Sequence, residues 1–329
     1  MTVYQAPAAE ARPRVLASTV GLAETDWLAL RRTGLGSSDA PAVVGLSPWA
    51  SPLGVWLDKT GQAPDRPATE AMTLGTALEP VVADLVARRE GRRVQRRRAI
   101  LQHPTHDWML ANLDRRIRDD SGGWRTLEIK TTSAFQADAW ADGPPTPVLL
   151  QCWHQLAVTG EPYQYAVALI GGQHLTPLFR VDADDAAVRA LVEVEQRFWL
   201  DYVLAGRMPP LTGAGDEAEQ LRTLWPESAS GRRVELPAEA ADWLQARADA
   251  LHDRDLASAR AEALTARLQA LMGPAEEATL AGQPVIRWKS HTQAGFDLAR
   301  FRAEHPDLAA QYARMDARRP FRILKGAEK

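Results

Sequence analysis

The chain has 329 residues, of which 45% are hydrophobic and 25% charged, as in a globular protein with one large or two smaller domains. It has no apolar run long enough to cross a bilayer and no signal-peptide core near its N-terminus, so we expect a cytoplasmic protein without a membrane segment. The single cysteine, Cys152, excludes an internal disulfide, a zinc ribbon and a four-cysteine iron–sulfur cluster, and the net charge of −3 argues against a general DNA-coating protein while leaving room for a local basic groove.

The first two thirds of the chain have the pattern of one α/β domain. Residues 1–22 carry little periodic signal, so we expect an irregular lead-in there. A domain over residues 23–210 follows, with helices predicted at 25–33, 39–44, 73–89 and 147–160 and strands at 93–101, 107–117, 124–131, 163–170 and 175–181. This order predicts an α/β fold in which a mixed central sheet is flanked by helices.

The remaining residues, 211–329, have a different composition. Residues 211–234 are expected to form a linker, and residues 236–272 are rich in alanine, arginine and leucine up to Gly273 and Pro274. The leucine spacing is compatible with a coiled coil, although a helical hairpin packed on the main domain is favoured. Short strands at 285–289 and 321–324 and a helix at 298–304 complete this C-terminal helical extension.

The residues with the clearest chemical potential are Asp114 and, after a predicted hairpin, Glu128-Ile129-Lys130. Alternate residues of a strand share a face, so Glu128 and Lys130 point together while Ile129 points to the core. Mg²⁺ takes oxygen ligands, often one or two carboxylates completed by water and phosphate. Asp114, Glu128 and the carbonyl of Ile129 are therefore candidate metal ligands, and Lys130 is a candidate for holding the attacking water during phosphodiester hydrolysis. An exposed strand face is the alternative explanation for this short pattern.

Polar residues on two predicted helices strengthen this hypothesis. Glu79 lies in the helix before the strands, where it would supply another carboxylate, or else be a solvated helix residue. Gln151 and Gln155 lie four positions apart, on one face of the helix after the Glu-x-Lys strand. They are candidates for hydrogen bonds to a phosphate, a water or a metal ligand, and an ordinary polar stripe is the alternative.

A turn rich in hydroxyl groups precedes the second predicted helix. Ser37 and Ser38 lie in the turn Gly36-Ser37-Ser38-Asp39, shortly after Arg31 and Arg32. Backbone amides, hydroxyls and a guanidinium together form a suitable cradle for a phosphate group, with simple helix capping as the alternative. The sequence leaves open which of the two arginines takes the phosphate.

Other residues have less decisive patterns. Seven arginines fall within eleven positions, a density suited to non-specific phosphate contacts or to a solvated face: Arg88, Arg89, Arg92, Arg93, Arg96, Arg97 and Arg98. Trp27, Trp49 and Trp56 are better explained by core packing than by stacking on an unpaired base. The histidines lack metal-binding spacing, which argues against a zinc site.

Taken together, the ordered motifs resemble a known family. The series is Gly36-Ser37-Ser38-Asp39, Gly75-x3-Glu79-Pro80, Asn112-Leu113-Asp114, Leu127-Glu128-Ile129-Lys130-Thr131 and Gln151-x3-Gln155. Over about residues 25–205 it resembles the YqaJ-type viral recombinases, which include the lambda-type alkaline exonucleases and belong to the PD-(D/E)xK restriction-endonuclease-like nucleases. The family pattern often has a proline where this chain has Leu113, and an aromatic residue where it has Val148.

The resemblance implies roles for individual residues. Asp114 and Glu128 would bind Mg²⁺ or Mn²⁺, Lys130 would assist the nucleophilic water, and Glu79 would lie close enough to serve a second metal. Arg32 and Ser38 match positions that hold a 5′-terminal phosphate, although the turn differs in length from the lambda-type one. Gln151 matches the motif glutamine after the core strand.

The leading functional hypothesis is a 5′→3′ exonuclease that digests one strand of linear double-stranded DNA. It would leave 3′ single strands for a single-strand annealing protein. The resemblance also implies a phage or prophage origin, a bacterial cytoplasmic location and a homotrimeric ring around DNA. An endonuclease of the same fold and a non-catalytic DNA-binding or annealing module are the alternatives, and the complete Asp/Glu/Lys set argues against the second because carboxylates repel phosphate unless a cation intervenes.

Overall fold

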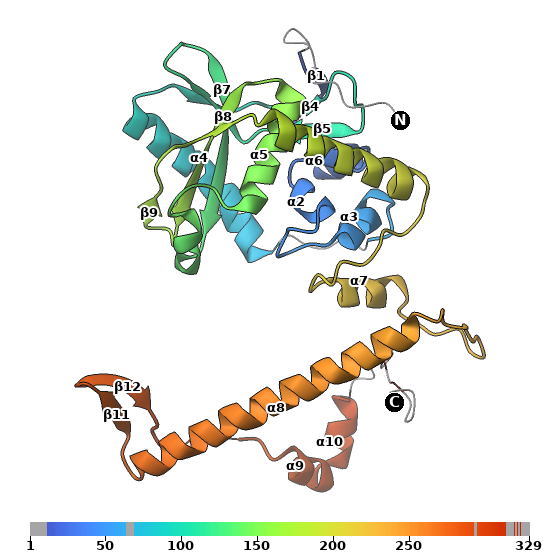
Figure 1. Cartoon of the computed structure of the whole chain (residues 1–329), viewed down its shortest axis with the longest axis vertical. Helices are drawn as coiled ribbons and strands as arrows, with labels where there is room; N and C mark the ends of the chain where they lie inside the picture. The colour runs from blue at the N-terminus through green and yellow to red at the C-terminus, as the bar shows by residue number, and fades with distance from the viewer. Residues whose placement is uncertain are drawn as a thin grey trace. The chain divides into compact units, whose positions relative to one another are not determined.

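The structure is a computed structural model that describes residues 12–63, 69–292, 295–313, 319, 321 and 323 (Figure 1). The chain divides into two compact units, Met1–Trp225 and Pro226–Lys329. Unit 1 includes several elements that the sequence did not predict, among them strand β1 (Arg14–Ser18), in the expected lead-in, and helix α7 (Glu217–Leu224), in the expected linker. Residues 1–11 of the predicted lead-in lie outside the described residues.

The larger sheet of unit 1 has six strands. The strands are β3 (Val94–Gln95), β6 (Arg115–Arg118), β7 (Trp124–Thr132), β8 (Tyr163–Ile170), β9 (His174–Leu175) and β10 (Phe179–Asp182). Their order in the sheet is β10-β8-β7-β6-β3, and β9 also pairs with β8. Strands β7 and β8 run parallel, while the other pairs are antiparallel. The mixed sheet expected from the sequence is therefore confirmed.

A second sheet of four strands has the order β1-β4-β5-β2, with β2 (Leu35–Gly36), β4 (Ala99–Gln102) and β5 (Met109–Asn112). The strands predicted at 93–101 and 107–117 were each wrong as single elements, because the chain changes sheet within both segments. The second change is abrupt. Only Leu113 and Asp114 separate β5 of the smaller sheet from β6 of the larger one, which places Asp114 where the two sheets meet.

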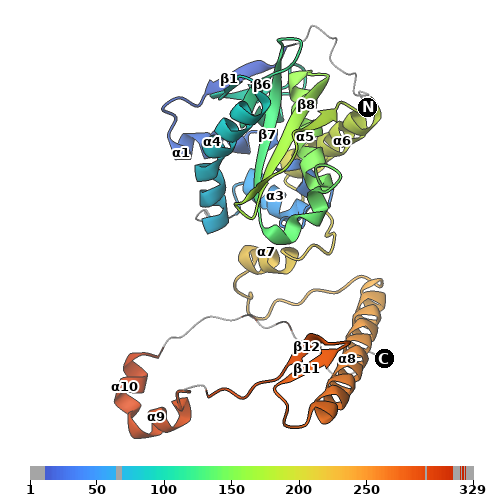
Figure 2. The ribbon, with the colours of Figure 1, turned by 90° about the vertical axis from the view of Figure 1, so that its left-hand side faces the viewer.

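Helices cover both faces of the paired strands β7 and β8 (Figure 2). Helix α4 (Glu70–Glu90) packs Val82 and Val86 against Ile129 and its neighbours on one face. Helix α5 (Thr146–Thr159) packs Cys152 and Leu156 on the other face. It connects two parallel strands, as a crossover of this kind must. The alternation along β7 therefore directs Ile129 to α4 and its even-numbered neighbours to α5.

The remaining elements of unit 1 surround α5 and the smaller sheet. They are α1 (Glu24–Arg32), α2 (Ala40–Val43), α3 (Pro52–Lys59), the short helices η1 (Ala134–Gln136) and η2 (Asp138–Trp140), α6 (Asp185–Phe198) and its π-helical continuation η3 (Trp199–Leu204). The Ser51 side chain caps α3 by accepting a hydrogen bond from the Gly54 amide at 3.1 Å. Trp56 is part of the buried core here, as the sequence favoured, whereas Trp49 is 75% exposed.

Unit 2 begins with one long helix, α8 (Ala240–Met272). The helical hairpin favoured for this segment is wrong, because the helix contains no glycine or proline at which the chain would turn back. A hairpin of β11 (Glu277–Leu280) and β12 (Gln283–Arg287) follows, and then α9 (Leu298–Glu304) and α10 (Pro306–Gln311). The predicted segment 321–324 falls mainly outside the described residues. Among the described helices, none is both long and apolar enough to span a membrane.

Candidate active site

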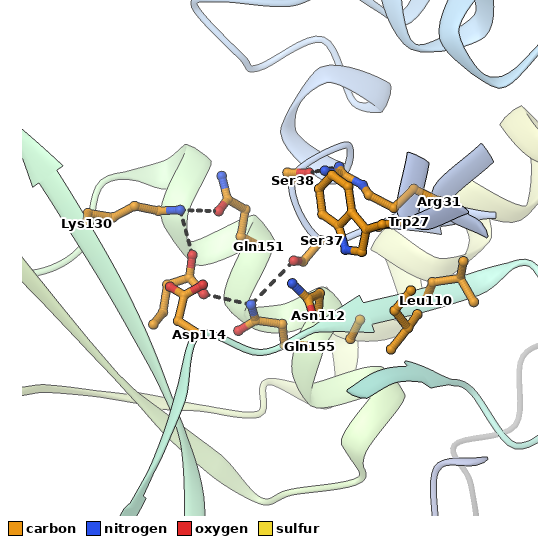
Figure 3. Close-up of a pocket in the computed structure, with 14 residues that line it drawn as sticks. Trp27, Arg31, Ser37, Ser38, Leu110, Asn112, Asp114, Lys130, Gln151 and Gln155 are labelled. Atoms are coloured by element: carbon orange, nitrogen blue, oxygen red, sulfur yellow. Dashed lines mark hydrogen bonds and ion pairs between the residues drawn. The ribbon is translucent and has the colours of Figure 1, made fainter. Parts of the chain in front are cut away.

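One cavity of unit 1 collects most of the residues singled out from the sequence (Figure 3). Its polar lining comes from α1, the turn before α2, the junction after β5, strand β7 and helix α5. These residues are Trp27, Arg31, Ser37, Ser38, Asn112, Asp114, Glu128, Lys130, Gln151 and Gln155. Segments more than a hundred residues apart in sequence therefore meet at a single site.

Glu128 and Lys130 lie on the face of β7 that is covered by α5. Glu128 is 3% exposed, and its Oε1 lies 2.6 Å from the Lys130 Nζ. Its second oxygen accepts a hydrogen bond of 2.7 Å from the Gln155 amide. Ionised side chains are rarely buried unless charges and hydrogen bonds compensate them, and both carboxylate oxygens here have such a partner.

The two glutamines of α5 hold this pair in place. The Lys130 ammonium donates a hydrogen bond of 2.6 Å to the Gln151 Oε1. Gln155, which is 1% exposed, also accepts a hydrogen bond of 2.8 Å from Gln164 and donates one of 3.4 Å to the Ser37 hydroxyl. Burial alone would lower the pKa of Lys130, but the charges of Glu128 and Asp114 outweigh it and raise that pKa, so the side chain remains an ammonium.

Asp114 completes the acidic group from the junction between the two sheets. Its Oδ2 accepts a hydrogen bond of 2.9 Å from the Ile129 amide, which fixes it beside β7. Burial, and then the nearby charge of Glu128, raises the pKa of Asp114 to about 8. A cation bound between the two carboxylates would remove this repulsion and favour the ionised form of Asp114.

The donor set fits a hard divalent cation. Within the described part of the chain, no group of three or more His, Cys, Asp or Glu side chains is arranged to hold a metal ion. Mg²⁺ usually binds through one or two carboxylates, with water and substrate phosphate completing its shell. Asp114 and Glu128 meet this requirement, and the Ile129 carbonyl remains a candidate third ligand. Zinc, which prefers three or four nitrogen and sulfur ligands, does not fit this set.

Glu79 lies near Asp114 but outside this cavity. It forms an ion pair with Arg115 and does not line the cavity that contains Glu128. It does line a neighbouring cavity together with Asp114, and its charge contributes to the raised pKa of Asp114. Glu79 is therefore near the carboxylates, but a second metal ion would have to compete with Arg115 for it.

The arginines next to the Gly-Ser-Ser-Asp turn differ in their contacts. The Arg31 guanidinium lines the cavity, donates a hydrogen bond of 2.8 Å to the Ser38 hydroxyl and lies 4.7 Å from the centre of the Trp27 ring. Arg32 does not line this cavity and pairs with Asp58 at 3.3 Å. The structure thus brings Arg31 together with the serines and places Arg32, the residue matched by the family resemblance, elsewhere.

A buried ion pair that the sequence did not indicate supports this turn. The Lys59 side chain is fully buried, and its Nζ lies 2.7 Å from Asp39 and donates a hydrogen bond of 3.1 Å to the Arg31 carbonyl. Asp39 in turn accepts a hydrogen bond of 2.9 Å from the Gly36 amide. Burial opposes ionisation of Asp39, but the charges of Lys59 and Arg31 lower its pKa. Asp39 makes no side-chain cap to α2, so simple helix capping does not explain the turn.

Two further residues of α5 lie next to the site without lining it. His154, fully buried, contacts the Leu110 carbonyl through Nε2 at 2.8 Å and Glu195 through Nδ1 at 2.9 Å. Cys152 is also fully buried, and burial together with the charge of Glu128 raises the pKa of its thiol. Trp27, for which the sequence favoured core packing, is instead part of the cavity lining.

Comparisons with known proteins place these observations in a family. The model of the YqaJ-like viral recombinase domain matches residues 26–162. The uncharacterized protein YqaJ of Bacillus subtilis (strain 168) is 37% identical over 231 residues, which cover 69% of this chain and 71% of that protein. The segment matched by the family model includes Asp114, Glu128 and Lys130.

Solved structures also resemble the chain. An alkaline exonuclease from Laribacter hongkongensis is 20% identical with a TM-score of 0.46, over 55% of this chain and 93% of that one. The same exonuclease in complex with dAMP gives a TM-score of 0.45, over 60% and 96% of the two chains. The identity to the Bacillus protein and the family-model match lead to one conclusion: the chain belongs to the YqaJ-like viral recombinase family.

Proposed function

We propose that the chain is a metal-dependent nuclease that hydrolyses phosphodiester bonds of linear double-stranded DNA. The observation that carries the proposal is the convergence of Asp114, Glu128 and Lys130 in one cavity. Two carboxylates that repel each other, with an ammonium beside them, suit a centre that binds a cation and a phosphate. Membership of a viral recombinase family supports DNA as the substrate.

Asp114 and Glu128 would hold Mg²⁺ or Mn²⁺, which when bound supplies Lewis acidity and lowers the pKa of a bound water. The protein residues provide orientation and charge. Gln155 fixes one oxygen of Glu128, and the Ile129 amide fixes one oxygen of Asp114, so both carboxylates are positioned before substrate arrives.

Lys130 acts as a donor of hydrogen bonds and positive charge. An ammonium has three donor protons, and the two contacts to Glu128 and Gln151 leave one for a water or a phosphate oxygen. Because its pKa is raised, Lys130 does not take a proton from the attacking water. Its role is to orient that water and to stabilise the negative charge that develops on the phosphate.

The Arg31–Ser38 pair supports digestion from a DNA end. It lines the same cavity as the carboxylates, so a terminal 5′-phosphate held there would leave the first phosphodiester near Asp114 and Glu128. We therefore propose a 5′→3′ exonuclease that leaves 3′ single strands. A single-strand annealing partner, a homotrimeric assembly around DNA and a location in the bacterial cytoplasm belong to the same proposal.

A substrate panel tests the reaction. The full chain is incubated with 5′-phosphorylated linear duplex, 5′-hydroxyl duplex and closed circular DNA, each with Mg²⁺ or with EDTA. We expect Mg²⁺-dependent digestion of the linear duplexes, faster for the phosphorylated one, and an intact circle. Cleavage of the circle would favour an endonuclease, and the absence of metal-dependent cleavage would favour a DNA-binding module.

A substitution of Glu128 tests whether the reaction takes place at this site. Glu128→Gln keeps the shape of the side chain and removes its charge, so we expect hydrolysis to fall at least about a hundredfold, as for loss of a catalytic group. Duplex binding in EDTA should be retained, which separates loss of chemistry from loss of folding. Glu193→Gln, on the exposed surface of α6, is the matched control. Full activity of Glu128→Gln would refute the site.

A further inference from the structure

The dense arginine run of residues 88–98 separates into two groups in the structure. Arg89 donates a hydrogen bond of 2.6 Å to the Thr176 carbonyl, and Arg92 pairs with Asp120 at 2.7 Å. These two arginines attach the end of α4 to the neighbouring strands and turns. Arg96, Arg97 and Arg98 lie farther along, in the segment between β3 and β4 where the chain passes from one sheet to the other.

The second group lines a cavity next to the catalytic one. All three arginines contribute to this cavity of about 530 Å³, together with Glu79. Trp27, Asn112 and Asp114 line both cavities, so the two are adjacent and Asp114 lies between them. Asp114 thus borders both the cavity that contains Arg31 and Ser38 and the cavity that contains the three consecutive arginines.

These arginines are available for an anionic ligand. Arg96 and Arg98 are exposed and Arg97 is half-buried, and no carboxylate of the described residues forms an ion pair with any of them. Two acidic residues line the same cavity, and of these Glu79 is paired with Arg115 while Asp114 accepts a hydrogen bond from the Ile129 amide. Three adjacent cations without partners repel each other, and this repulsion is relieved when phosphates bind.

The positive surface continues beyond this cavity. Arg97 also lines a third cavity, with Arg116 and Arg125. Arg116 is paired with Glu161 at 3.6 Å and Arg125 with Asp119 at 3.0 Å, while the buried Nε atoms of both have no hydrogen-bond partner in the described part of the chain. The lining of that cavity includes more arginines than acidic residues, since Glu161 is its acidic residue. The net charge of the cavity is therefore positive. An extended polyanion fits two adjoining basic cavities better than a single small anion does.

We propose that Arg96, Arg97 and Arg98 bind the backbone phosphates of the strand that is being digested, on the far side of the scissile bond from Arg31 and Ser38. The strand then crosses Asp114 and Glu128 while held at both ends, which places one phosphodiester at the carboxylates. This assignment rests on the proposed function, because it takes the carboxylate pair as the point of cleavage. Phosphate binding by the three arginines is nevertheless measurable without cleavage.

The test is the salt dependence of duplex binding in EDTA, measured by fluorescence anisotropy. Each lost phosphate contact reduces the slope of log K against log salt by ~0.9, so Arg96→Ala/Arg98→Ala should reduce the slope by about 1.8 and weaken binding. The charge-preserving Arg96→Lys/Arg98→Lys should keep most of the slope. The control Arg189→Ala/Arg197→Ala, which removes two exposed arginines of α6 outside all three cavities, should match wild type. An unchanged slope in Arg96→Ala/Arg98→Ala would overturn the proposal.

Substrate length provides a second readout. With Mg²⁺, Arg96→Ala/Arg98→Ala should raise KM for a long 5′-phosphorylated oligonucleotide but not for a 5′-phosphorylated dinucleotide, which has no phosphate beyond the scissile bond for the arginines to bind. Equal effects on both substrates would contradict the assignment. The two proposals fail separately: a wild-type chain that binds DNA but never cleaves it refutes the nuclease, whereas cleavage with an unchanged salt slope refutes only the arginine surface.

Discussion

Arg31 and Arg32 illustrate how adjacent residues acquire different contacts. Successive positions on a helix point in directions about 100° apart, so the two side chains start toward different surroundings. At the end of α1, Arg31 lies over Trp27 and contacts Ser38, whereas Arg32 pairs with Asp58. The difference decides which guanidinium faces the cavity that contains Asp114 and Glu128.

We therefore predict that Arg31→Ala reduces the preference for a 5′-phosphorylated end. A hydrogen bond to a charged group contributes about 1.5–3 kcal/mol, so the ratio of digestion rates for 5′-phosphate and 5′-hydroxyl duplex should fall about tenfold or more. Arg32→Ala is the matched control and should leave the ratio nearly unchanged. The prediction is wrong if Arg32→Ala abolishes the preference and Arg31→Ala preserves it.

Single residues also mark the limits of prediction from sequence. Asp114, Glu128 and Lys130 were identified because strand alternation and their ordered motifs constrain them strongly. The pairing of Lys59 with Asp39 was not predicted, because it depends on how α3 packs beside the turn. The choice between Arg31 and Arg32 likewise required the orientation of α1 about its own axis, which two adjacent arginines in a sequence do not reveal.

Among the elements, α5 connects the largest number of parts of the site. Gln151 and Gln155 reach β7, while His154 links the helix to β5 through the Leu110 carbonyl and to α6 through Glu195. Burial alone would lower the pKa of His154, but the Glu195 charge and the two hydrogen bonds raise it above its ordinary value of 6.5. The imidazolium is thus favoured in the folded protein.

The His154–Glu195 pair predicts that the free energy of unfolding depends on pH. A raised folded pKa contributes stability that is complete below pH 6.5 and is lost as the pH rises through the folded pKa of His154. Glu195→Gln removes the charge that raises this pKa. It should weaken the pH dependence and cost about 3–5 kcal/mol at low pH, as breaking a buried ion pair does.

Urea unfolding of both proteins between about pH 6 and about pH 9 measures the difference, since the free energy of unfolding follows proton uptake. Comparing the variant with wild type at each pH cancels the contributions of other titrating groups. An identical pH slope in Glu195→Gln and wild type would show that the pair does not couple folding to protonation.

The order of the main strands and of α4 and α5 was predictable, whereas α3 and α6 were not predicted. The parallel pair β7–β8 with a crossover helix follows from a Glu-x-Lys strand, a long helix and a second apolar strand. The changes of sheet at 93–101 and 107–117 were not predicted, because local alternation does not report which strand becomes the partner. The partner of a strand depends on residues that are distant from it in the sequence.

At the scale of the whole molecule, the three cavities described above belong to unit 1, because all of them are lined by residues of Met1–Trp225. Residues 226–239 are exposed throughout and contain no helix or strand. Exposed segments of this kind are preferred sites of proteolysis, and Arg232 and Arg233 offer trypsin two adjacent sites there.

Limited trypsin digestion should therefore cut early within residues 226–239. The N-terminal fragment should retain Mg²⁺-dependent hydrolysis, because every proposed catalytic residue lies in it. Mass spectrometry locates the cut, and the substrate panel measures the activity of the purified fragment. Inactivity of an otherwise folded fragment would mean that unit 2 contributes to cleavage.

The position of Cys152 provides a native reporter for the catalytic layer. It is the only cysteine of the chain and is fully buried between α5 and the sheet, so a thiol reagent reaches it only when that layer opens. The raised pKa of the thiol further suppresses background reaction, because thiolates are the reactive species. The alkylation rate of the Cys152 thiol would thus measure how often α5, which carries Gln151 and Gln155, separates from β7, which carries Glu128 and Lys130.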